Sequence, residues 1–381
     1  MFKRRIEYLL ARILSVINIL IPKDGYLIVF YHTAESFGDN TEAIYNYISK
    51  KDRQNKYKKE VLLPMINKRH TKIYCAWRYM RARYVFFSYG DTKIRPTKNQ
   101  IVINQWHGSP LKTVGKLTKD KSFSREKLDS FTYLLSSSEL FIKPLAKAFG
   151  CEEEKVKIVG QARNDYLFGK ERSLYFENTL KGSEYAKTVL WMPTFRVSKD
   201  SRFVDSSAVN EETLLPIFSK FKELDKLNAF LAKNNVLIVI KIHHYANFKS
   251  QEYSNIKYVT NDDLEKTKTK LYSFVKDFDS LVTDYSSIFP DYILLDRPIG
   301  FTVDDYETYK KERGFSIKDP IQYMAGNQIK NIDDFYGYID DLVYGKDKYK
   351  NERGRVNKIM NKYGNGNCER LCKLAGIKFD Q

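Results

Sequence analysis

Residues 235–244 have the sequence NVLIVIKIHH and form the most apolar strand-like segment of the chain. A short apolar run rich in β-branched residues is typical of a strand that is buried on both faces of a parallel sheet. Because side chains alternate along a strand, Lys241 and His243 are expected on the same face of it. A cation and an imidazole that converge at a strand end suit a phosphate-bearing ligand. The alternative is a polar strand end that is simply exposed to solvent.

Similar apolar segments recur along the chain and alternate with helical stretches. We predict further strands at residues 25–32, 84–89, 100–107, 133–138, 155–160, 188–195, 280–287 and 298–303. Helices are predicted at residues 42–51, at 138–150 with Gly150 as the stop signal, and across about 211–234. Strands that alternate with helices indicate a mainly parallel, doubly wound sheet.

The stretch GKERSLYFENTLKGSEYAK (169–187) is charged, poor in apolar residues, and interrupts this alternation. The alternation restarts after it, and 381 residues exceed the size of one ordinary core. We therefore predict two Rossmann-like, doubly wound α/β domains that face each other. The expected boundaries are 1–22 for an N-terminal helix, 23–170 for the first domain and 171–381 for the second.

The N-terminal segment MFKRRIEYLLARILSVINILIPKDG (1–25) predicts an amphipathic helix. Its apolar residues form a helical stripe, with basic residues nearby. The stripe consists of Ile6, Leu9, Leu10, Ile13, Leu14, Ile17 and Leu20, and the basic residues are Lys3, Arg4, Arg5 and Arg12. The segment is shorter and more charged than a membrane-spanning helix of about 20 residues, and it lacks a signal-peptide cleavage site. We expect it to lie in a membrane interface; the alternative is a first helix packed on the protein's own core.

The composition indicates a folded, basic protein. Hydrophobic residues make up 43% of the chain, and the formal net charge of +18 predicts attraction to a polyanion. The alternative explanation of the charge is a genome of low GC content, whose proteins are rich in lysine. The four cysteines lack zinc-like spacing, and Walker, GxGxxG, GxSxG and HExxH motifs are absent. We therefore expect a reducing cytoplasm, no metal and no cofactor.

Polar clusters follow the predicted strands at their carboxyl ends, where α/β sheets bind ligands. Trp106, His107, Gly108 and Ser109 follow the strand that ends at Gln105. A glycine beside His107 leaves the imidazole uncrowded and lets a ligand approach the backbone. The alternative is a histidine that caps the following helix.

A second cluster, TDYSS (283–287), follows the strand SLV and precedes the helical stretch IFPDYILLD. Asp and Ser are ordinary caps at a helix start. The free N–H groups and the dipole at such a position also form an anion site, to which Ser286 and Ser287 add hydroxyl donors. The sequence leaves both interpretations open, a helix cap and an anion site.

Two smaller clusters each carry an arginine. GQARND (160–165) follows the strand KVKIV, and PTFR (193–196) follows the strand TVLW. Arg163 and Arg196 could each hold a diphosphate through two parallel hydrogen bonds. Alternatively, either could be a surface ion-pair partner.

Together these segments resemble the CDP-glycerol glycerophosphotransferases of teichoic acid and related capsule synthesis, from about Gly25 to the C-terminus. In chain order the matching landmarks are Asp39 and Asn40, WHGSPLK (106–112), GQARND (160–165), MPTFR (192–196), KIHH (241–244), TDYSSIFPDY (283–292) and NGNCER (365–370). The family is similar in fold to two-domain glycosyltransferases of the GT-B type. The resemblance makes residues 23–170 the acceptor-side domain and residues 171–381 the domain that binds the CDP donor.

The resemblance also implies roles for individual residues. His107 and His243 match motif histidines regarded as essential. The expected donor or phosphate contacts are Thr194, Arg196, Lys241, Asp284, Ser286, Ser287 and Arg370. Further site candidates are Gly108, Ser109, Arg163, Asp165, His244 and Asp291.

Three positions depart from the family pattern. Ser109 replaces the usual Thr and keeps the hydroxyl. His244 replaces the usual Pro, so that two adjacent imidazoles compete for the role assigned to His243. Pro290 occupies a usual Phe position, which a helix tolerates only within its first turn.

The resemblance implies that an acceptor hydroxyl attacks the β-phosphorus of a CDP-polyol and expels CMP. His107, with an ordinary imidazole pKa near about 6.5, is the expected general base. Lys241 and His243 are expected to stabilise the phosphates. The expected partners are CDP-glycerol or CDP-ribitol, a lipid-linked saccharide acceptor and an anionic membrane surface, but no nucleic acid. The expected location is the cytoplasmic face of the cell membrane, as a peripheral protein.

Two rival functions stay open on the sequence. One is a GT-B sugar-nucleotide glycosyltransferase of cell-surface polysaccharide synthesis. The other is a non-catalytic basic protein that binds a polyanion, which the placement of the polar clusters at strand ends disfavours. Within the favoured family, glycerol and ribitol donors are alternatives, as are a primase and a polymerase, and the length of the chain slightly favours the primase.

Overall fold

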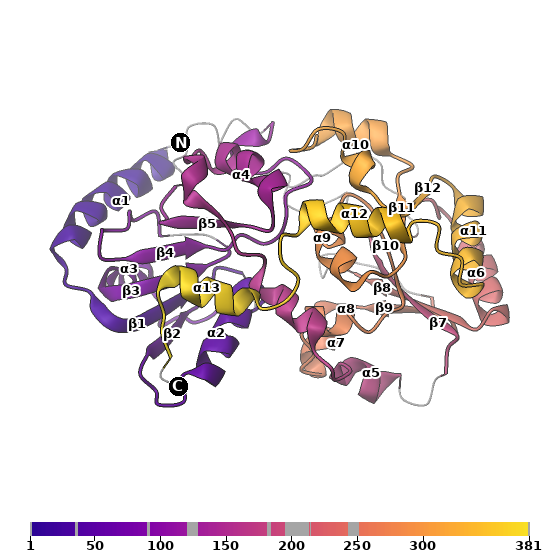
Figure 1. The fold of residues 1–381 in the computed structure, drawn as a ribbon, viewed down its shortest axis with the longest axis horizontal. Helices are drawn as coiled ribbons and strands as arrows, with labels where there is room; N and C mark the ends of the chain where they lie inside the picture. Colours follow the sequence, from indigo (N-terminus) through magenta and orange to yellow (C-terminus); the bar gives the residue numbers. More distant parts are fainter. Residues whose placement is uncertain are drawn as a thin grey trace. The chain divides into compact units, whose positions relative to one another are not determined.

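The computed structural model describes residues 2–34, 37–89, 92–119, 129–180, 184–194, 213, 215–242 and 251–379. The chain divides into two compact units. The first comprises Met1–Ser109, Lys121–Asp165 and Asn361–Gln381, and the second comprises Pro110–Asp120 and Tyr166–Met360. Each unit is built around one parallel sheet of six strands (Figure 1). The predicted α/β fold with two parallel sheets is thereby confirmed.

The sheet of the first unit has the strand order β2-β1-β3-β4-β5-β6. Its strands are β1 (Asp24–Tyr31), β2 (Lys58–Leu62), β3 (Ala82–Phe87), β4 (Ile101–Asn104), β5 (Tyr133–Ser136) and β6 (Val156–Ile158). Residues 27–30 of β1 are buried in succession, so both faces of the sheet are covered. The chain adds β2 on one side of β1 and then continues with β3 on the other, so the strand order reverses between β1 and β3.

The sheet of the second unit has the strand order β12-β11-β10-β7-β8-β9. Its strands are β7 (Lys187–Met192), β8 (Val236–Lys241), β9 (Ile256–Val259), β10 (Ser280–Thr283), β11 (Ile299–Thr302) and β12 (Asn327–Ile329). Every residue of β8 is buried, which confirms the strand predicted from its continuous apolar sequence. The strand order of this sheet reverses between β7 and β10.

The helices of the first unit include one from the far end of the chain. They are α1 (Phe2–Leu20), α2 (Asp39–Lys51), α3 (Lys72–Arg81), α4 (Ile142–Phe149) and α13 (Asn367–Ala375). Helix α4 ends at Gly150, which has a left-handed backbone with φ 67°, as its stop signal predicted. The C-terminal helix α13 packs beside α2 (Figure 1). The predicted boundaries had assigned this helix to the second domain.

The helices of the second unit surround its sheet. They are α5 (Leu174–Thr179), α6 (Phe221–Lys233), α7 (Asn261–Lys266), α8 (Leu271–Val275), α9 (Phe289–Tyr292), α10 (Tyr306–Glu312), α11 (Ile332–Val343) and α12 (Lys350–Met360). The fully buried Trp191 of β7 packs against Phe335 of α11, with ring centroids 5.1 Å apart. Phe218 lies against both rings, so the start of the α6 segment is fixed to the same core.

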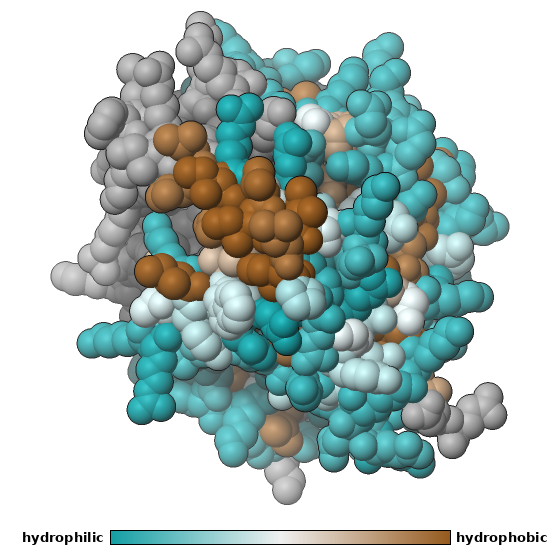
Figure 2. Space-filling model, turned by 90° about the vertical axis from the view of Figure 1, so that its left-hand side faces the viewer, coloured by the Kyte–Doolittle hydropathy of each residue, from teal (hydrophilic) through white to brown (hydrophobic). Residues whose placement is uncertain are grey.

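Helix α1 packs on the first unit through one side and exposes apolar residues on the other. Asn18 is fully buried, and its Nδ2 donates to the Arg95 carbonyl at 2.9 Å and to Gln100 Oε1 at 2.7 Å. The exposed apolar residues of α1 are Leu9, Leu10, Ile13, Val16, Ile17, Ile19 and Leu20. Figure 2 shows apolar side chains gathered on this side of the molecule. Among the described residues, no helix has the length and apolar character needed to cross a membrane.

Candidate active site

The first sheet carries its candidate site where the strand order reverses. Ligands of open α/β sheets bind outside the carboxyl ends of the strands at such a point. β1 leads to the start of α2 at Asp39, β3 leads to Tyr89, and the next strand, β4, leads to Trp106 and His107. His107 therefore lies at the strand end where the sequence predicted it.

Backbone geometry and ring stacking together hold His107. Trp106 has a left-handed backbone with φ 54°, which is uncommon for a bulky residue, and its N–H donates to Asn104 Oδ1 at 2.9 Å. The imidazole stacks on the Tyr89 ring, with centroids 4.7 Å apart and planes 10° from parallel. Gly108 follows with φ 139°, a conformation that favours glycine. Such local backbone strain is typical of functional sites.

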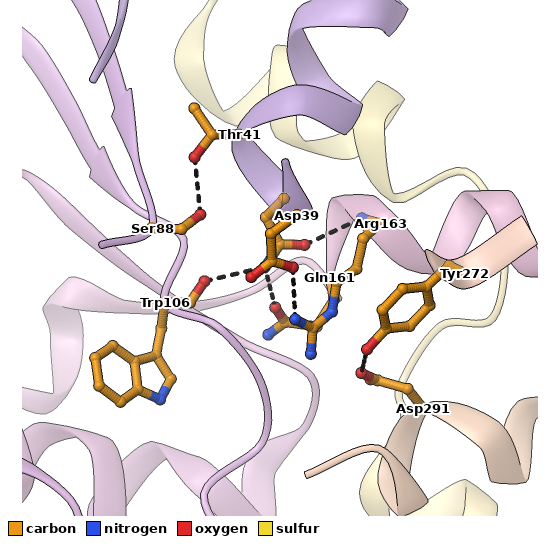
Figure 3. A network of polar contacts seen from close by, with 9 residues as sticks. Asp39, Thr41, Ser88, Trp106, Gln161, Arg163, Tyr272 and Asp291 are labelled. Carbon is orange, nitrogen blue, oxygen red and sulfur yellow. Dashed lines mark hydrogen bonds and ion pairs between the residues drawn. The ribbon is translucent and has the colours of Figure 1, made fainter. Parts of the chain in front are cut away.

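Arg163 and Ser109 contact other protein groups in the first unit. Arg163 Nη1 lies 2.5 Å from Asp39 Oδ1, and these side chains are only 8% and 13% exposed (Figure 3). Burial, together with the charge of Asp39 and a hydrogen bond to it, raises the pKa of Tyr89. The Ser109 hydroxyl is buried and lies 2.8 Å from the Ser137 hydroxyl. The described contact of Arg163 is thus a buried ion pair, whereas the alternative to its predicted diphosphate role was a surface ion pair; the diphosphate role stays a prediction.

Asp165 and Arg370 fasten the start of α13 to the first unit. The Asp165 carboxylate accepts hydrogen bonds from the N–H groups of Asn367 at 2.8 Å and Cys368 at 2.9 Å. These bonds satisfy free N–H groups of the helix start, and the negative charge suits the helix dipole. Arg370 donates to the Val159 carbonyl at 3.1 Å, just after β6. Arg370 therefore lies in the first unit, whereas the predicted boundaries placed it with the donor-binding domain.

The second sheet also joins two predicted site residues where its strand order reverses. Thr194 follows β7, and Asp284 follows the neighbouring strand β10. Asp284 is fully buried and accepts hydrogen bonds from the Thr194 N–H at 2.7 Å and from the Thr194 hydroxyl at 2.5 Å. The carboxylate thus holds Thr194 in place at the edge of the sheet where a ligand is expected.

The TDYSS cluster leads into α9, which contains only four residues. Pro290 lies in its first turn, as its position in a helix requires. Ser286 and Ser287 are half-buried just before the helix, while Asp291 is fully buried and accepts a hydrogen bond from the Tyr272 hydroxyl at 2.5 Å (Figure 3). Because so short a helix has a small dipole, the loop hydroxyls and N–H groups are the stronger anion donors here.

Lys241 ends β8 and is only 8% exposed. Its Nζ donates to Asn261 Oδ1 at 2.6 Å and to the Ile242 carbonyl at 3.1 Å. Desolvation by burial lowers the pKa of Lys241 to about 8, against the opposing effect of the Asp263 and Asp262 charges. A buried cation with a strongly shifted pKa at a strand end is typical of a functional site.

Three predicted site residues lie outside the described residues, namely Arg196, His243 and His244. The role of Arg196 as a diphosphate contact stays a prediction. The motif role assigned to His243, or to His244 in its place, also stays a prediction.

The sequence did not identify three residues that surround the His107 loop. Asn40, Tyr89 and Gln161 all contact this loop or each other. Asn40 reaches residues 66 and 121 positions further along the chain. The signals were the Asp39-Asn40 pair and the segment GQARND (160–165), which contains Gln161, but a single sequence does not show what these residues contact.

Each unit presents polar groups of a different kind at the carboxyl ends of its strands. The first presents an imidazole that can accept a proton. The second presents a buried ammonium group, two serine hydroxyls and an anchored threonine, which can bind oxyanions. The roles predicted for these residues in the two domains stay predictions.

The chain has relatives among proteins of known function. A family model described as CDP-Glycerol:Poly(glycerophosphate) glycerophosphotransferase matches residues 13–374. A teichoic acid poly(glycerol phosphate) polymerase from Bacillus spizizenii is 27% identical over 344 residues, which cover 81% of this chain and 82% of that protein. A teichoic acid ribitol-phosphate primase from the same organism is 27% identical over 234 residues, which cover 57% of this chain and 55% of that protein.

Solved structures show the same architecture. The wall teichoic acid polymerase TagF superposes with a TM-score of 0.73 at 19% identity, covering 98% of this chain and 94% of that chain. This likeness shows the fold, and the family follows from the match over residues 13–374, which spans nearly the whole sequence. The chain belongs to the CDP-glycerol:poly(glycerophosphate) glycerophosphotransferase family.

Proposed function

We propose that this enzyme transfers glycerol phosphate, or a related polyol phosphate such as ribitol phosphate, from a CDP-activated donor to a hydroxyl of a lipid-linked saccharide or polymer, in teichoic acid or capsule-like polymer synthesis. The observation that carries this proposal is the family match over residues 13–374. Relatives named for glycerol phosphate and for ribitol phosphate support either polyol. A structure of a TagF variant after a soak with CDPG supports a CDP-linked donor.

In the proposed reaction, the acceptor oxygen bonds to the β-phosphorus of the donor. The bond between that phosphorus and the bridging oxygen breaks, and CMP leaves with the bridging oxygen. The proton of the acceptor hydroxyl passes to the imidazole of His107. Since this chemistry depends mainly on positioning and on stabilising charge, a stacked and backbone-held imidazole suits the role of base.

The second unit contributes the groups that bind the diphosphate. Lys241 carries a positive charge below pH 8, where its pKa lies, and a bound diphosphate stabilises that charge. The hydroxyls of Ser286 and Ser287 supply neutral donors, and Asp284 holds Thr194 at the end of β7. Neutralising charge on the transferring and leaving phosphates lowers the barrier to the reaction.

The purified full chain, incubated with each candidate donor and a lipid-linked disaccharide, tests the proposal. CMP release that depends on the acceptor is expected with CDP-glycerol or CDP-ribitol, with product length read by mass spectrometry. His107→Ala should lower kcat at least about 100-fold, because general base catalysis contributes about that much or more. His70→Ala is the matched control, since the described contacts of the His70 ring, with the Leu63 N–H, Asn67 and Tyr74, all lie away from the candidate site.

Two other outcomes would replace the proposal. Release of UDP or GDP from a nucleotide sugar, without CMP release from either CDP-polyol, would identify a glycosyltransferase. Salt-sensitive oligonucleotide binding that His107→Ala leaves unchanged, without any turnover, would identify a polyanion-binding protein.

We place the enzyme at the cytoplasmic face of the cell membrane, as a peripheral protein held there by α1. Asn18 and Ala11 fix one side of α1 to the first unit, and its exposed apolar residues are free to enter a bilayer interface (Figure 2). The net charge of +18 favours anionic headgroups. A surface of this kind would bring the enzyme to a lipid-linked acceptor.

A further inference from the structure

The first three residues of α2 each contact a different part of the carboxyl edge of the first sheet (Figure 3). Asp39 pairs with a side chain of the loop after β6. Asn40 contacts the loops after β4 and β6. Thr41 contacts the end of β3 through its hydroxyl. The start of α2 therefore joins the loops that surround His107.

Asn40 is the centre of this arrangement and is fully buried. Its Nδ2 donates to the Trp106 carbonyl at 3.0 Å and to Gln161 Oε1 at 2.6 Å. Its Oδ1 accepts a hydrogen bond from the Arg163 N–H at 3.0 Å. Both amide hydrogens and the amide oxygen are thus in use, and the buried amide is fully engaged by three separate partners.

The contact with Trp106 bears directly on His107. The Trp106 carbonyl belongs to the planar peptide group that links these two residues, so Asn40 fixes the orientation of that plane. On the other side of Trp106, its backbone N–H donates a hydrogen bond to Asn104 Oδ1. A tryptophan keeps a left-handed backbone conformation only when its surroundings stabilise it, and Asn40 and Asn104 provide hydrogen bonds that do so.

The imidazole ring is fixed from the same helix start. Tyr89 stacks on His107 at 4.7 Å between centroids, and burial, together with the charge of Asp39 that acts on the Tyr89 hydroxyl, raises the pKa of this hydroxyl. Asp39 itself has a left-handed backbone with φ 60° and pairs with Arg163. The beginning of α2 therefore controls both the backbone and the ring of His107.

We propose that Asn40 is a positioning residue for His107: it holds the peptide group before the imidazole so that the ring points at the acceptor hydroxyl. The inference rests on the proposed function, which makes His107 the base. Without the Nδ2 donor this peptide group can rotate, and the ring is displaced from its line to the reacting oxygen. A displacement of about 1 Å lowers a rate about 100-fold, and we expect a loss of kcat of that order for Asn40→Asp.

Asn255→Asp is the matched control. Asn255 is also buried, at 7% exposure, and its Nδ2 also donates to a main-chain carbonyl, that of Val236, at 2.9 Å. It lies in the second unit at the beginning of β9, away from the carboxyl ends of the strands. Both variants should lower the melting temperature, but only Asn40→Asp should lower kcat about 100-fold, with little change in the KM of the donor. Equal losses of kcat in the two variants, corrected for the folded fraction, would overturn the proposal.

A double-mutant cycle separates positioning from a general loss of structure. In a His107→Ala background, Asn40→Asp should cause no further loss of kcat, because its effect passes through the missing imidazole. Losses that multiply in the double variant would overturn the proposal. If Asn40→Asp does not fold, Asn40→Ser takes its place, since the shorter and neutral side chain also removes the Nδ2 donor.

A measurement without substrate tests the positioning even if the proposed function fails. Diethylpyrocarbonate modifies exposed imidazoles, and peptide mapping gives the rate at His107 relative to His70. Asn40→Asp should change this ratio by a measurable factor, while Asn255→Asp should leave it unaltered. An unchanged ratio in a folded Asn40→Asp protein would overturn the proposal, whereas absence of CMP release by the unmodified enzyme would overturn only the assigned reaction.

Discussion

Asp284→Asn should loosen the second sheet at the point where its strand order reverses. Asp284 is fully buried and accepts hydrogen bonds from the N–H and the hydroxyl of Thr194, at 2.7 and 2.5 Å. An asparagine of the same shape has one acceptor oxygen in place of two, and its amide hydrogens face a donor. One of the two Thr194 groups, which are partly buried, therefore loses its carboxylate acceptor.

The expected size of the effect follows from these two bonds. A hydrogen bond to a charged group contributes about 1.5–3 kcal/mol, and a buried donor left without a partner costs a similar amount. Asp284→Asn should therefore lower the free energy of unfolding by about 2–3 kcal/mol. In a unit of this size each kcal/mol lowers the melting temperature by about 2–4 °C, so calorimetry should show a decrease of about 5–10 °C.

Asp279→Asn is a control with the same chemistry at the opposite end of the same two strands. Asp279 accepts from the N–H and the hydroxyl of Thr188, at 2.7 and 2.9 Å, but in an exposed position. Water replaces the lost partner there, so the cost should stay below about 1 kcal/mol. Asp284→Asn should also raise the KM of the donor, because Thr194 is no longer held, while Asp279→Asn should not.

Equal decreases in melting temperature for the two variants would refute the reasoning that burial makes the Asp284 contacts strong. A different result would refute the positioning role itself. If Asp284→Asn keeps its melting temperature and its donor KM but loses turnover, the carboxylate acts on the reacting groups directly.

Four further predictions concern Lys241, Asp165 and helix α1. Burial lowers the pKa of Lys241 to about 8, while the unfolded chain keeps the ordinary value of 10.5, so the unfolded state binds more protons between pH 8 and pH 10.5. The free energy of unfolding of the wild type, measured by urea titration, should therefore rise relative to that of Lys241→Met as the pH increases through this range. The donor KM should also rise above pH 8 in wild type but not in Lys241→Arg, and a flat profile in both would exclude a role for this charge. Asp165→Ala removes the hydrogen bonds that cap α13 and should lower the free energy of unfolding by about 1–2 kcal/mol; unaltered urea unfolding would argue against the cap. Replacing the exposed Ile13 and Ile17 by Asp should weaken sedimentation with anionic liposomes at least about tenfold, since each apolar side chain buried in the bilayer interface contributes about 1.5–3 kcal/mol. The circular dichroism spectrum should not change. Unchanged sedimentation would assign membrane binding to the basic surface of the folded units.

The interior strands could be predicted from the sequence, while most of the edge strands could not. β1, β3, β4, β7, β8, β10 and β11 lie inside their sheets and carry the continuous apolar runs that burial on both faces produces. The strands that escaped prediction are β2 (KKEVL), β9 (IKYV) and β12 (NQI), and each is an edge strand. Edge strands are short and carry polar or charged residues that face water, so their sequences resemble loops.

The place of the C-terminal helix could not be predicted for a different reason. Strand and helix periodicity describes neighbours in sequence, whereas α13 is fixed by a contact between Asp165 and Asn367, which are 202 residues apart. Nothing in the composition of residues 361–381 distinguishes a helix that returns to the first unit from one that stays with the second. The boundary near residue 170, by contrast, coincides with a change in composition and lies close to the division after Asp165.

In the candidate site, too, some features could be predicted from the sequence and others could not. His107 and Lys241 could be placed at the carboxyl edges of their sheets because His107 follows β4 and Lys241 ends β8, and both strands have a plain apolar pattern. The contacts of Asp284, Arg163 and Asn40 could not, because they depend on which strands and loops become neighbours. Residue type and position suggested ligand contacts for Asp284 and Arg163, and the structure shows hydrogen bonds to other protein groups.

The central claim is that the enzyme transfers the β-phosphorus of its donor together with the polyol. A single turnover of CDP-glycerol or CDP-ribitol labelled at the β-phosphorus, with a lipid-linked disaccharide as acceptor, tests this most directly. We expect the label in the acceptor-linked product, as a phosphodiester that still carries the polyol, and unlabelled CMP in equal amount. Label recovered as inorganic phosphate or in the nucleotide, or a polyol transferred without its phosphorus, would contradict the account.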